Sequence, residues 1–316
     1  MTDLLDDSVL QLELPQGTIR YRDSGGGGRG DGDSGGRGGG GGRGGGGDDR
    51  GDGGGEPIVF LHGALCNGGI WRGVIPELAG DYRCIAPDLP KGSHLFPMHA
   101  DADLTPPGMV RLVVDFLDAL GLDRVIVVGN DSGGAIAQML AAAYPDRIGR
   151  LILTSCDTFG QFPPRYLKPL HPLTFVPGLG ASVARLWYTK PVRRLFFWSI
   201  VKHGLAPDVL DSYVEPLRDP GVRRDVVKFF RGTAPRHTRQ AARRLATFTR
   251  PTLIAWSADD LWFRRNNGKR LARTIPGATF TLIPDARTFV PEDQPTELAR
   301  TIHAFLTANS TSHPVQ

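Results

Sequence analysis

The fold of this chain is decided by Val127-Val128-Gly129-Asn130-Asp131-Ser132-Gly133-Gly134-Ala135, where a predicted strand turns into a predicted helix. A sharp strand-to-helix turn exposes one side chain, and it needs small residues two positions before and after that side chain because the two backbones approach closely. Centred on Asp131, those positions hold Gly129 and Gly133; centred on Ser132, one of them is Asn130, which fits poorly. The spacing therefore favours Asp131 as the exposed residue. A helix that begins with an N-cap aspartate is the structural alternative.

The sequence around this turn alternates between apolar strand patterns and helical patterns. Continuous apolar runs predict buried strands, and apolar residues at helical spacing predict helices between them. Strands are predicted at 9–14, 18–22, 57–61, 82–87, 124–129, 151–154, 251–256 and 279–283, and helices at 105–120, 135–144, 266–274 and 296–307. This order is typical of an α/β fold with a mostly parallel sheet flanked by helices.

Two segments interrupt the alternation. Residues 25–55 hold 21 of the 42 glycines and no apolar side chain, so we expect a disordered loop insert. Residues 158–250 contain short, proline-rich helical pieces and no convincing parallel strand. The predicted organisation is a core at 1–157 and 251–316 with a helical insert at 158–250.

A second motif, His62-Gly63-Ala64-Leu65, ends the predicted strand at 57–61. In a parallel sheet the carboxyl ends of neighbouring strands meet at one edge, so this turn can face the turn at Asp131. Backbone N–H groups at Ala64 or Leu65 could then stabilise a developing oxyanion, with Ser132 on the same side. We expect a structural role for His62.

These motifs resemble the α/β-hydrolase superfamily, nearest the branch of epoxide hydrolases and haloalkane dehalogenases. That branch uses a Gly-x-Asp-x-Gly-Gly elbow, which residues 129–134 match. The resemblance implies an α/β-hydrolase fold, a helical cap at 158–250 above the active site, and an enzyme that needs no cofactor and uses Asp131 as nucleophile. Dehalogenases place an aromatic residue after the nucleophile; Ser132 stands there in this chain, which argues against dehalogenation.

In that family a carboxylate after the penultimate strand orients a catalytic histidine. Asp260 matches this acid best, with Asp259 as its neighbour, and some relatives place the acid where this chain has Asp157. Asp157 and Asp260 could instead be ordinary caps.

The catalytic histidine is missing from its usual place. Where the family has Gly-His after the last strand, this chain has Arg287-Thr288, and threonine cannot act as a general base near neutral pH. His94 follows a strand whose carboxyl end should face the site, so it is the best substitute base; a plain surface-loop histidine is the alternative.

The sequence favours a hydrolase of a small, mostly apolar ester or epoxide-like substrate. A ligand binder without turnover and an esterase using Ser132 are the alternatives.

The insert has 17 Lys and Arg against 5 acids, which could attract an anionic or lipid-like substrate or a membrane surface, although solvated helix faces are the simpler interpretation. No nucleic-acid motif, metal-ligand cluster, transmembrane run or signal peptide is recognisable. We therefore expect a cytoplasmic monomer or homodimer without metal.

Overall fold

The computed structural model of the chain describes residues 9–25 and 56–310. The predicted disordered loop at 25–55 therefore lies outside the described residues, except for Gly25. Among the described residues, no helix combines the length and the apolar character that crossing a membrane requires.

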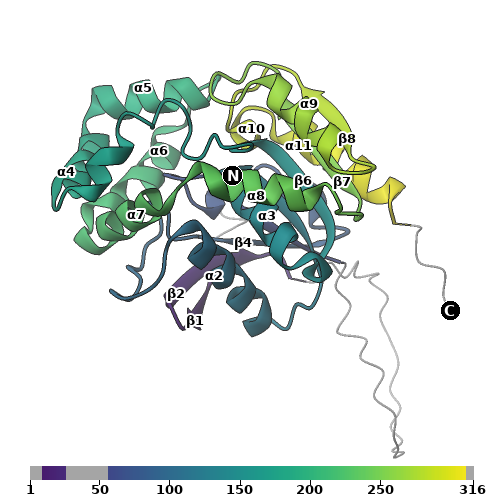
Figure 1. The fold of residues 1–316 in the computed structure, drawn as a ribbon, viewed down its shortest axis with the longest axis horizontal. Coiled ribbons are helices and arrows are strands. Elements are labelled where there is room, and N and C mark those ends of the chain that lie inside the picture. The colour runs from purple at the N-terminus through teal and green to yellow at the C-terminus, as the bar shows by residue number, and fades with distance from the viewer. Residues whose placement is uncertain (1–8, 26–55, 311–316) are drawn as a thin grey trace, which may run out of the picture.

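The described strands form one eight-stranded sheet in the order β1-β2-β4-β3-β5-β6-β7-β8 (Figure 1). The pairs β1–β2 and β2–β4 are antiparallel, and all pairs from β4 to β8 are parallel. The predicted α/β fold with a mostly parallel sheet is confirmed. The strands are β1 (Val9–Leu14), β2 (Gly17–Asp23), β3 (Pro57–Leu61), β4 (Arg83–Pro87), β5 (Val125–Asp131), β6 (Ile148–Cys156), β7 (Thr252–Ser257) and β8 (Thr279–Ile283).

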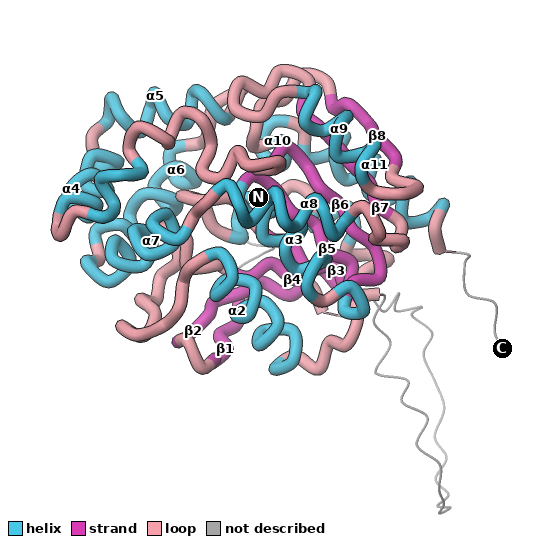
Figure 2. Tube along the Cα trace, in the orientation of Figure 1, coloured by secondary structure: helices cyan, strands magenta, loops and turns pink. Residues whose placement is uncertain are grey.

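Helices cover both faces of this sheet. On one face α2, α3, α8 and α9 pack side by side, and on the other α1 and α11 contact each other (Figures 1 and 2). The helix α2 begins as predicted, because the Thr105 hydroxyl accepts a hydrogen bond from the backbone of Gly108. The flanking helices are α1 (Ile75–Leu78), α2 (Pro106–Ala119), α3 (Ser132–Ala143), α8 (Pro235–Leu245), α9 (Arg265–Thr274), α10 (Val290–Asp293) and α11 (Pro295–Ala308).

The remaining helices lie between β6 and β7, beyond the carboxyl ends of the parallel strands (Figure 1). The helix α8 falls within the predicted insert at 158–250. It packs along α3, so it covers the sheet and not the site. The insert helices are α4 (Leu179–Arg185), α5 (Lys190–Ile200), α6 (Pro207–Val214) and α7 (Pro220–Gly232). Short 3-10 helices lie at Gly68–Trp71, Pro145–Arg147, His171–Phe175, Leu186–Tyr188 and Glu215–Arg218.

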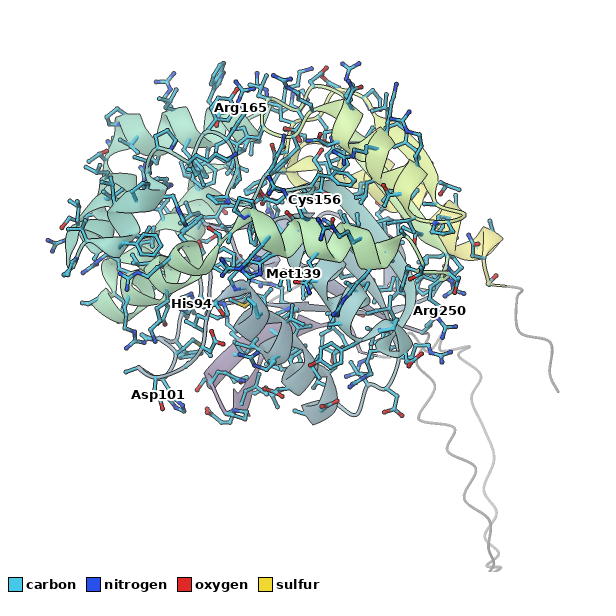
Figure 3. The ribbon with its side chains drawn as sticks, in the orientation of Figure 1. His94, Asp101, Met139, Cys156, Arg165 and Arg250 are labelled. Carbon is cyan, nitrogen blue, oxygen red and sulfur yellow. The ribbon has the colours of Figure 1, made fainter. Side chains whose placement is uncertain are left out.

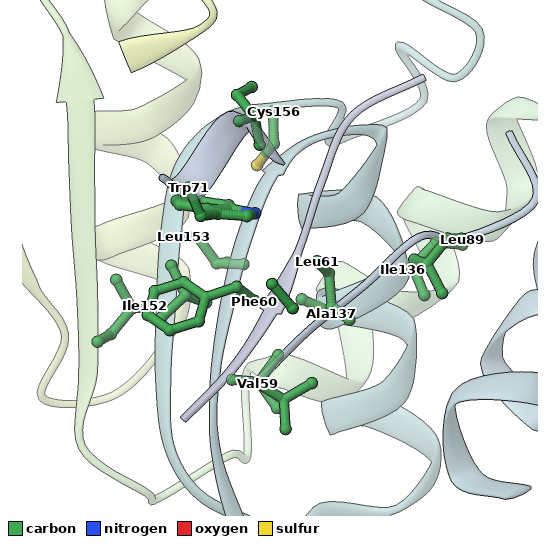
Figure 4. Packing of buried hydrophobic residues seen from close by; sticks show 14 of the residues in the cluster. Val59, Phe60, Leu61, Trp71, Leu89, Ile136, Ala137, Ile152, Leu153 and Cys156 are labelled. Atoms are coloured by element: carbon green, nitrogen blue, oxygen red, sulfur yellow. The ribbon is translucent and has the colours of Figure 1, made fainter. Parts of the chain in front are cut away.

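The core lies between the central strands and their helices. All seven residues of β5 are buried, as expected for a strand covered on both faces. On one side of β3 the ring of Phe60 packs against Trp71, with ring centroids 5.1 Å apart (Figure 4). On the other side Ile136 and Ala137 of α3 close the core. This packing holds the carboxyl end of β5 in one place.

Candidate active site

The turn from β5 into α3 presents Asp131 in a strained conformation, with φ 52° and ψ −127°. An L residue rarely adopts a positive φ, and such strain persists only where the surroundings impose it. Here three glycines impose it. A Cβ atom on Gly129 would lie 2.7 Å from the Gly134 backbone, and one on Gly133 would lie 2.1 Å from the carbonyl oxygen of Leu61. Asp131, rather than Ser132, is therefore the residue at the tip of the elbow turn.

The turn after β3 holds one oxygen of the Asp131 carboxylate. The Ala64 amide donates to Asp131 Oδ2 over 3.0 Å, and a Cβ atom on Gly63 would lie 2.5 Å from the same oxygen. Leu65 completes the turn with φ 58°. Burial raises the pKa of Asp131, while the backbone amides of Ser132 and Ala64 and the nearby Lys91 charge oppose that rise. The predicted oxyanion turn and the elbow thus meet.

His62 is a fixed structural residue. Its Nε2 accepts the Leu89 amide hydrogen over 2.8 Å, and its Nδ1 lies 2.6 Å from the carbonyl oxygen of Gly63, to which it donates. The ring is fully buried, and this burial moves its pKa well below the usual range. Both ring nitrogens are occupied, so a neutral His62 ties the β3 turn to the β4 loop.

Lys91 is a site residue that the sequence analysis missed. Its side chain is fully buried, donates from Nζ to the carbonyl oxygen of His62, and lies 3.4 Å from Ser132 Oγ. Burial lowers the pKa of Lys91 to about 8, although the carboxylates of Asp131 and Asp157 act in the opposite direction. Its position between a proline and a glycine at the carboxyl end of a core strand is the sequence pattern that could have indicated it.

Asp157 follows β6 and is buried beside this lysine. Neither of its carboxylate oxygens has a hydrogen-bond partner among the described residues. Burial, followed by the negative charge of Asp131, raises the pKa of Asp157 well above its usual range. Neither oxygen is paired, so burial favours the protonated form of this carboxyl group.

Asp260 and Thr288, the residues that the resemblance assigned to the acid and to the place of the missing histidine, contact each other. Thr288 Oγ1 donates to Asp260 Oδ1 over 2.9 Å, and the same oxygen accepts the amides of Trp262 and Phe263. Asp260 is partly exposed, but its Oδ2 is buried, and burial raises the pKa of this carboxyl to about 6. The structure therefore brings the predicted pair together, with a hydroxyl in place of an imidazole.

Asn130 is a second residue that the sequence analysis did not assign. Its Nδ2 donates to Thr154 Oγ1 and to the carbonyl oxygen of Thr288, each over 2.7 Å. This buried amide joins the elbow to β6 and to the loop after β8, so it positions Thr288 relative to Asp131.

His94, the predicted substitute base, contacts a different partner. Its Nε2 lies 3.3 Å from the carboxylate of Asp225 on α7, beneath the insert (Figure 3). Burial alone would raise the pKa of Asp225, but hydrogen bonds from His94, from the Met98 amide and from Arg224 lower it. His94 does not line the small cavity into which Asp131 opens. This geometry does not support His94 as the base.

The site opens into a small chamber with an apolar roof. A cavity of about 20 Å³, enough for about one water molecule, is lined by four polar residues, Asp131, Ser132, Asp157 and Thr233. Its roof includes Phe162, Phe196, Phe229 and Trp262. A second, apolar cavity of about 70 Å³ lies within the insert. The two cavities share Leu65, Pro163, Leu167 and Phe230 as walls.

The family described as alpha/beta hydrolase fold matches residues 56–295. The chain belongs to this family. As an α/β-hydrolase it is similar to haloalkane dehalogenase 2 of Mycobacterium tuberculosis, with 27% identity over 260 residues that cover 79% of this chain and 88% of that protein. It is also similar to a cis-3-alkyl-4-alkyloxetan-2-one decarboxylase of Xanthomonas campestris, with 28% identity over 280 residues, 83% of this chain and 91% of that protein.

The fold of this α/β-hydrolase also matches a crystal structure of haloalkane dehalogenase DbeA from Bradyrhizobium elkani. The TM-score is 0.76 at 18% identity, over 97% of this chain and 99% of that one. The predicted superfamily is thereby confirmed, near the dehalogenase branch, and the chain stands among hydrolases.

The buried acid Asp157 predicts a pH-dependent stability. Because its folded-state pKa is raised above the unfolded value of about 3.9, its contribution to stability is fully present below that value and is lost as pH rises through the folded pKa. Asp157→Asn should therefore raise Tm relative to wild type by an amount that grows between about pH 4 and pH 8, reaching about 2–4 °C or more. Thermal unfolding at several pH values measures this.

Asp208→Asn, which alters an exposed aspartate of α6, is the matched control and should leave the pH dependence of Tm unchanged. An Asp157→Asn difference in Tm that stays constant with pH would contradict the neutral state of Asp157.

Proposed function

We propose that this α/β-hydrolase attacks a small, mostly apolar epoxide-like or ester substrate with Asp131, without a cofactor. The observation that carries the proposal is the strained elbow, which points the Asp131 carboxylate into the chamber while the Ala64 amide holds its Oδ2. The other oxygen is then free to attack carbon. The aromatic roof and the adjoining apolar cavity support an apolar substrate, because they desolvate alkyl groups well and charged groups poorly.

Asp157 supplies the proton that an epoxide needs. In the first step Asp131 forms a C–O bond to one ring carbon, the bond from that carbon to the ring oxygen breaks, and the neutral Asp157 carboxyl gives its proton to that oxygen. The products of this step are an Asp131 ester, an alcohol and an ionised Asp157. The raised pKa of Asp157 supports its role as the acid.

The same residue can replace the missing histidine in the second step. The Asp157 carboxylate accepts a proton from the water that attacks Asp131 Cγ, which produces a tetrahedral oxyanion at Oδ2. The Ala64 and Ser132 amides and the Lys91 charge stabilise that oxyanion. Collapse expels the product alkoxide, which takes the proton of the regenerated Asp131 carboxyl. Asp131 ends ionised and Asp157 ends protonated, as they began.

Thr288 favours a second reaction of the same nucleophile, one that consumes no water. The Xanthomonas relative is named for a four-membered lactone that bears two alkyl groups. If Asp131 opened such a ring at its alkyl carbon, the ring oxygen would leave as a carboxylate. Loss of CO₂ would then move the carbon–carbon bonding pair into a C=C bond and expel the Asp131 carboxylate. Neither step needs a general base, so a threonine at position 288 would not impair this route.

The proposal is tested with a panel of alkyl epoxides, p-nitrophenyl esters and a dialkyl oxetan-2-one in H₂¹⁸O. Hydrolysis through an Asp131 ester puts ¹⁸O into the Asp131 carboxylate, which peptide mass spectrometry detects. Decarboxylation yields an alkene and leaves Asp131 unlabelled. Asp131→Asn should abolish turnover in either case, whereas Ser132→Ala should leave it within about an order of magnitude.

Other outcomes support the alternatives. Loss of all turnover in Ser132→Ala with retained turnover in Asp131→Asn would indicate a serine esterase, in which Lys91 at 3.4 Å from Ser132 Oγ would be the base. Absence of product and of any adduct, with a ligand that raises Tm, would indicate a binding protein without turnover.

Lys91 should set the acid limb of the pH profile. Burial raises the pKa of Asp131 and the Lys91 charge lowers it, so Lys91→Met should move the acid limb of kcat/KM to higher pH by about one unit or more. Lys202→Met, at an exposed lysine that pairs with Asp259 and Asp285, is the control and should keep the wild-type profile. An unchanged acid limb in Lys91→Met would rule out this electrostatic role.

Thr288→His should speed the release of a covalent intermediate. The new imidazole would lie beside Asp260, whose Oδ1 now accepts the Thr288 hydroxyl, and a positioned base contributes about 10²–10⁴-fold to such a step. We expect single-turnover decay of the Asp131 ester to become at least about tenfold faster. Thr288→Val, which removes only the hydroxyl, is the control and should not accelerate decay. Equal decay rates in both variants would contradict the prediction.

A further inference from the structure

Exposed apolar side chains are concentrated on one part of the insert. Of the thirteen large hydrophobic side chains that are exposed in the described part of the chain, eight lie between residues 166 and 198. Leu195 and Trp198 of α5 are 66% and 58% exposed. Four of the eight border one hollow and are named the docking face: Tyr166, Leu170, Leu195 and Trp198. An apolar patch of this kind marks an interaction surface.

The docking face borders a shallow hollow. Side chains from three separate segments line it, at 166–170, 187–199 and 261–262. They include Tyr166, Leu195 and Trp198, while Phe197 and Ile200 of α5 point inward and are buried. The helix α5 is therefore amphipathic, with an apolar outer side that the described residues leave uncovered.

The charge around the docking face is mainly positive, although Arg193 pairs with Asp211 of α6 and Lys202 pairs with Asp259 and Asp285. Residues 158–205 contain seven Lys and Arg and no Asp or Glu. Lys168, Arg185, Lys190 and Arg194 are exposed and have no carboxylate within salt-bridge distance among the described residues. Arg165 is exposed and stacks on the ring of Tyr166, 4.7 Å from its centroid (Figure 3). Cations thus outnumber acids around the apolar side chains.

We propose that the docking face binds the surface of an anionic lipid bilayer. Aromatic and leucine side chains favour the boundary between headgroups and acyl chains, and nearby Lys and Arg are attracted to anionic headgroups. The excess of positive charge from Lys168, Arg185, Lys190 and Arg194 selects this occupant, because a water-soluble protein partner would need a surface both acidic and apolar to match it. The docking face lies on the bilayer and does not cross it.

The hollow also adjoins the chamber of Asp131. Leu167, Phe196 and Trp262 line both cavities, so three side chains separate the docking face from the site. If the proposed function holds, an apolar substrate dissolved in the bilayer would reach Asp131 by displacement of these side chains, without crossing water. Docking itself is independent of the reaction.

Vesicle binding by the full chain, measured by sedimentation without substrate, tests this proposal. We expect binding to phosphatidylcholine vesicles that contain phosphatidylglycerol to be at least about tenfold tighter than binding to pure phosphatidylcholine, and to weaken at high salt. Leu195→Glu and the double variant Arg185→Glu/Arg194→Glu should each weaken binding about tenfold or more. These side chains are exposed, so thermal unfolding should show native Tm values.

Leu10→Glu and Lys269→Glu are the matched controls, because they place the same charge at an exposed leucine of β1 and an exposed lysine of α9. Both should bind anionic vesicles within about twofold of wild type. The proposal fails if the chain stays in solution with anionic vesicles, or if Leu195→Glu binds as tightly as Leu10→Glu. It also fails if the wild-type protein is a dimer that does not bind vesicles and that Leu195→Glu dissociates. In that case a second copy of the chain would cover the docking face.

Discussion

The close approach of β5 and α3 is the constraint on which the rest of the site depends. A Cβ atom would meet the Gly134 backbone at Gly129, the carbonyl oxygen of Leu61 at Gly133, and the Cys156 side chain at Gly134. The start of α3 is therefore packed against β5, β3 and β6 at once, and the residue in the turn adopts a positive φ. That residue is Asp131. The strain is retained because the surrounding core is close-packed and cannot relax around the turn. The direction of one carboxylate is therefore set by the packing of the whole sheet.

A second constraint follows from burying this carboxylate. Asp131 and Asp157 are both enclosed, and two adjacent ionised carboxylates would repel each other strongly in such a setting. The Lys91 charge lowers the pKa of both carboxyl groups, whereas burial raises it, and the rise is larger for Asp157, which has no hydrogen-bond partner among the described residues. Both carboxyl groups line a space for about one water molecule. Such a division of roles between two like groups arises from their environments.

The insert is tied to the core by a buried polar network. Glu292 of α10 accepts two hydrogen bonds from Arg72 and one from the Tyr213 hydroxyl of α6, at 2.7, 2.6 and 2.5 Å. Because each partner is satisfied by the others, this network resists separation of the insert from the core at that edge. The aromatic roof near Phe196 and Trp262 is also joined to the core. Ring contacts and the Trp262 indole hydrogen bond to Ser199 hold it, and the Phe289 amide donates to the carbonyl oxygen of Ile200 over 2.9 Å.

The sequence by itself determined the sheet, the elbow and the Asp260–Thr288 pair, because each depends on residues that are local in the chain or in the register of the last strands. It did not determine the roles of Lys91, Asp157 and His94. Lys91 meets Ser132 across 41 residues and His94 meets Asp225 across 131, and no local pattern specifies which buried charges face one another. Only the tertiary structure decided that Lys91 lies in the site and that His94 pairs with Asp225 elsewhere. The reason is that the protonation and pairing of a buried group depend on its neighbours in space.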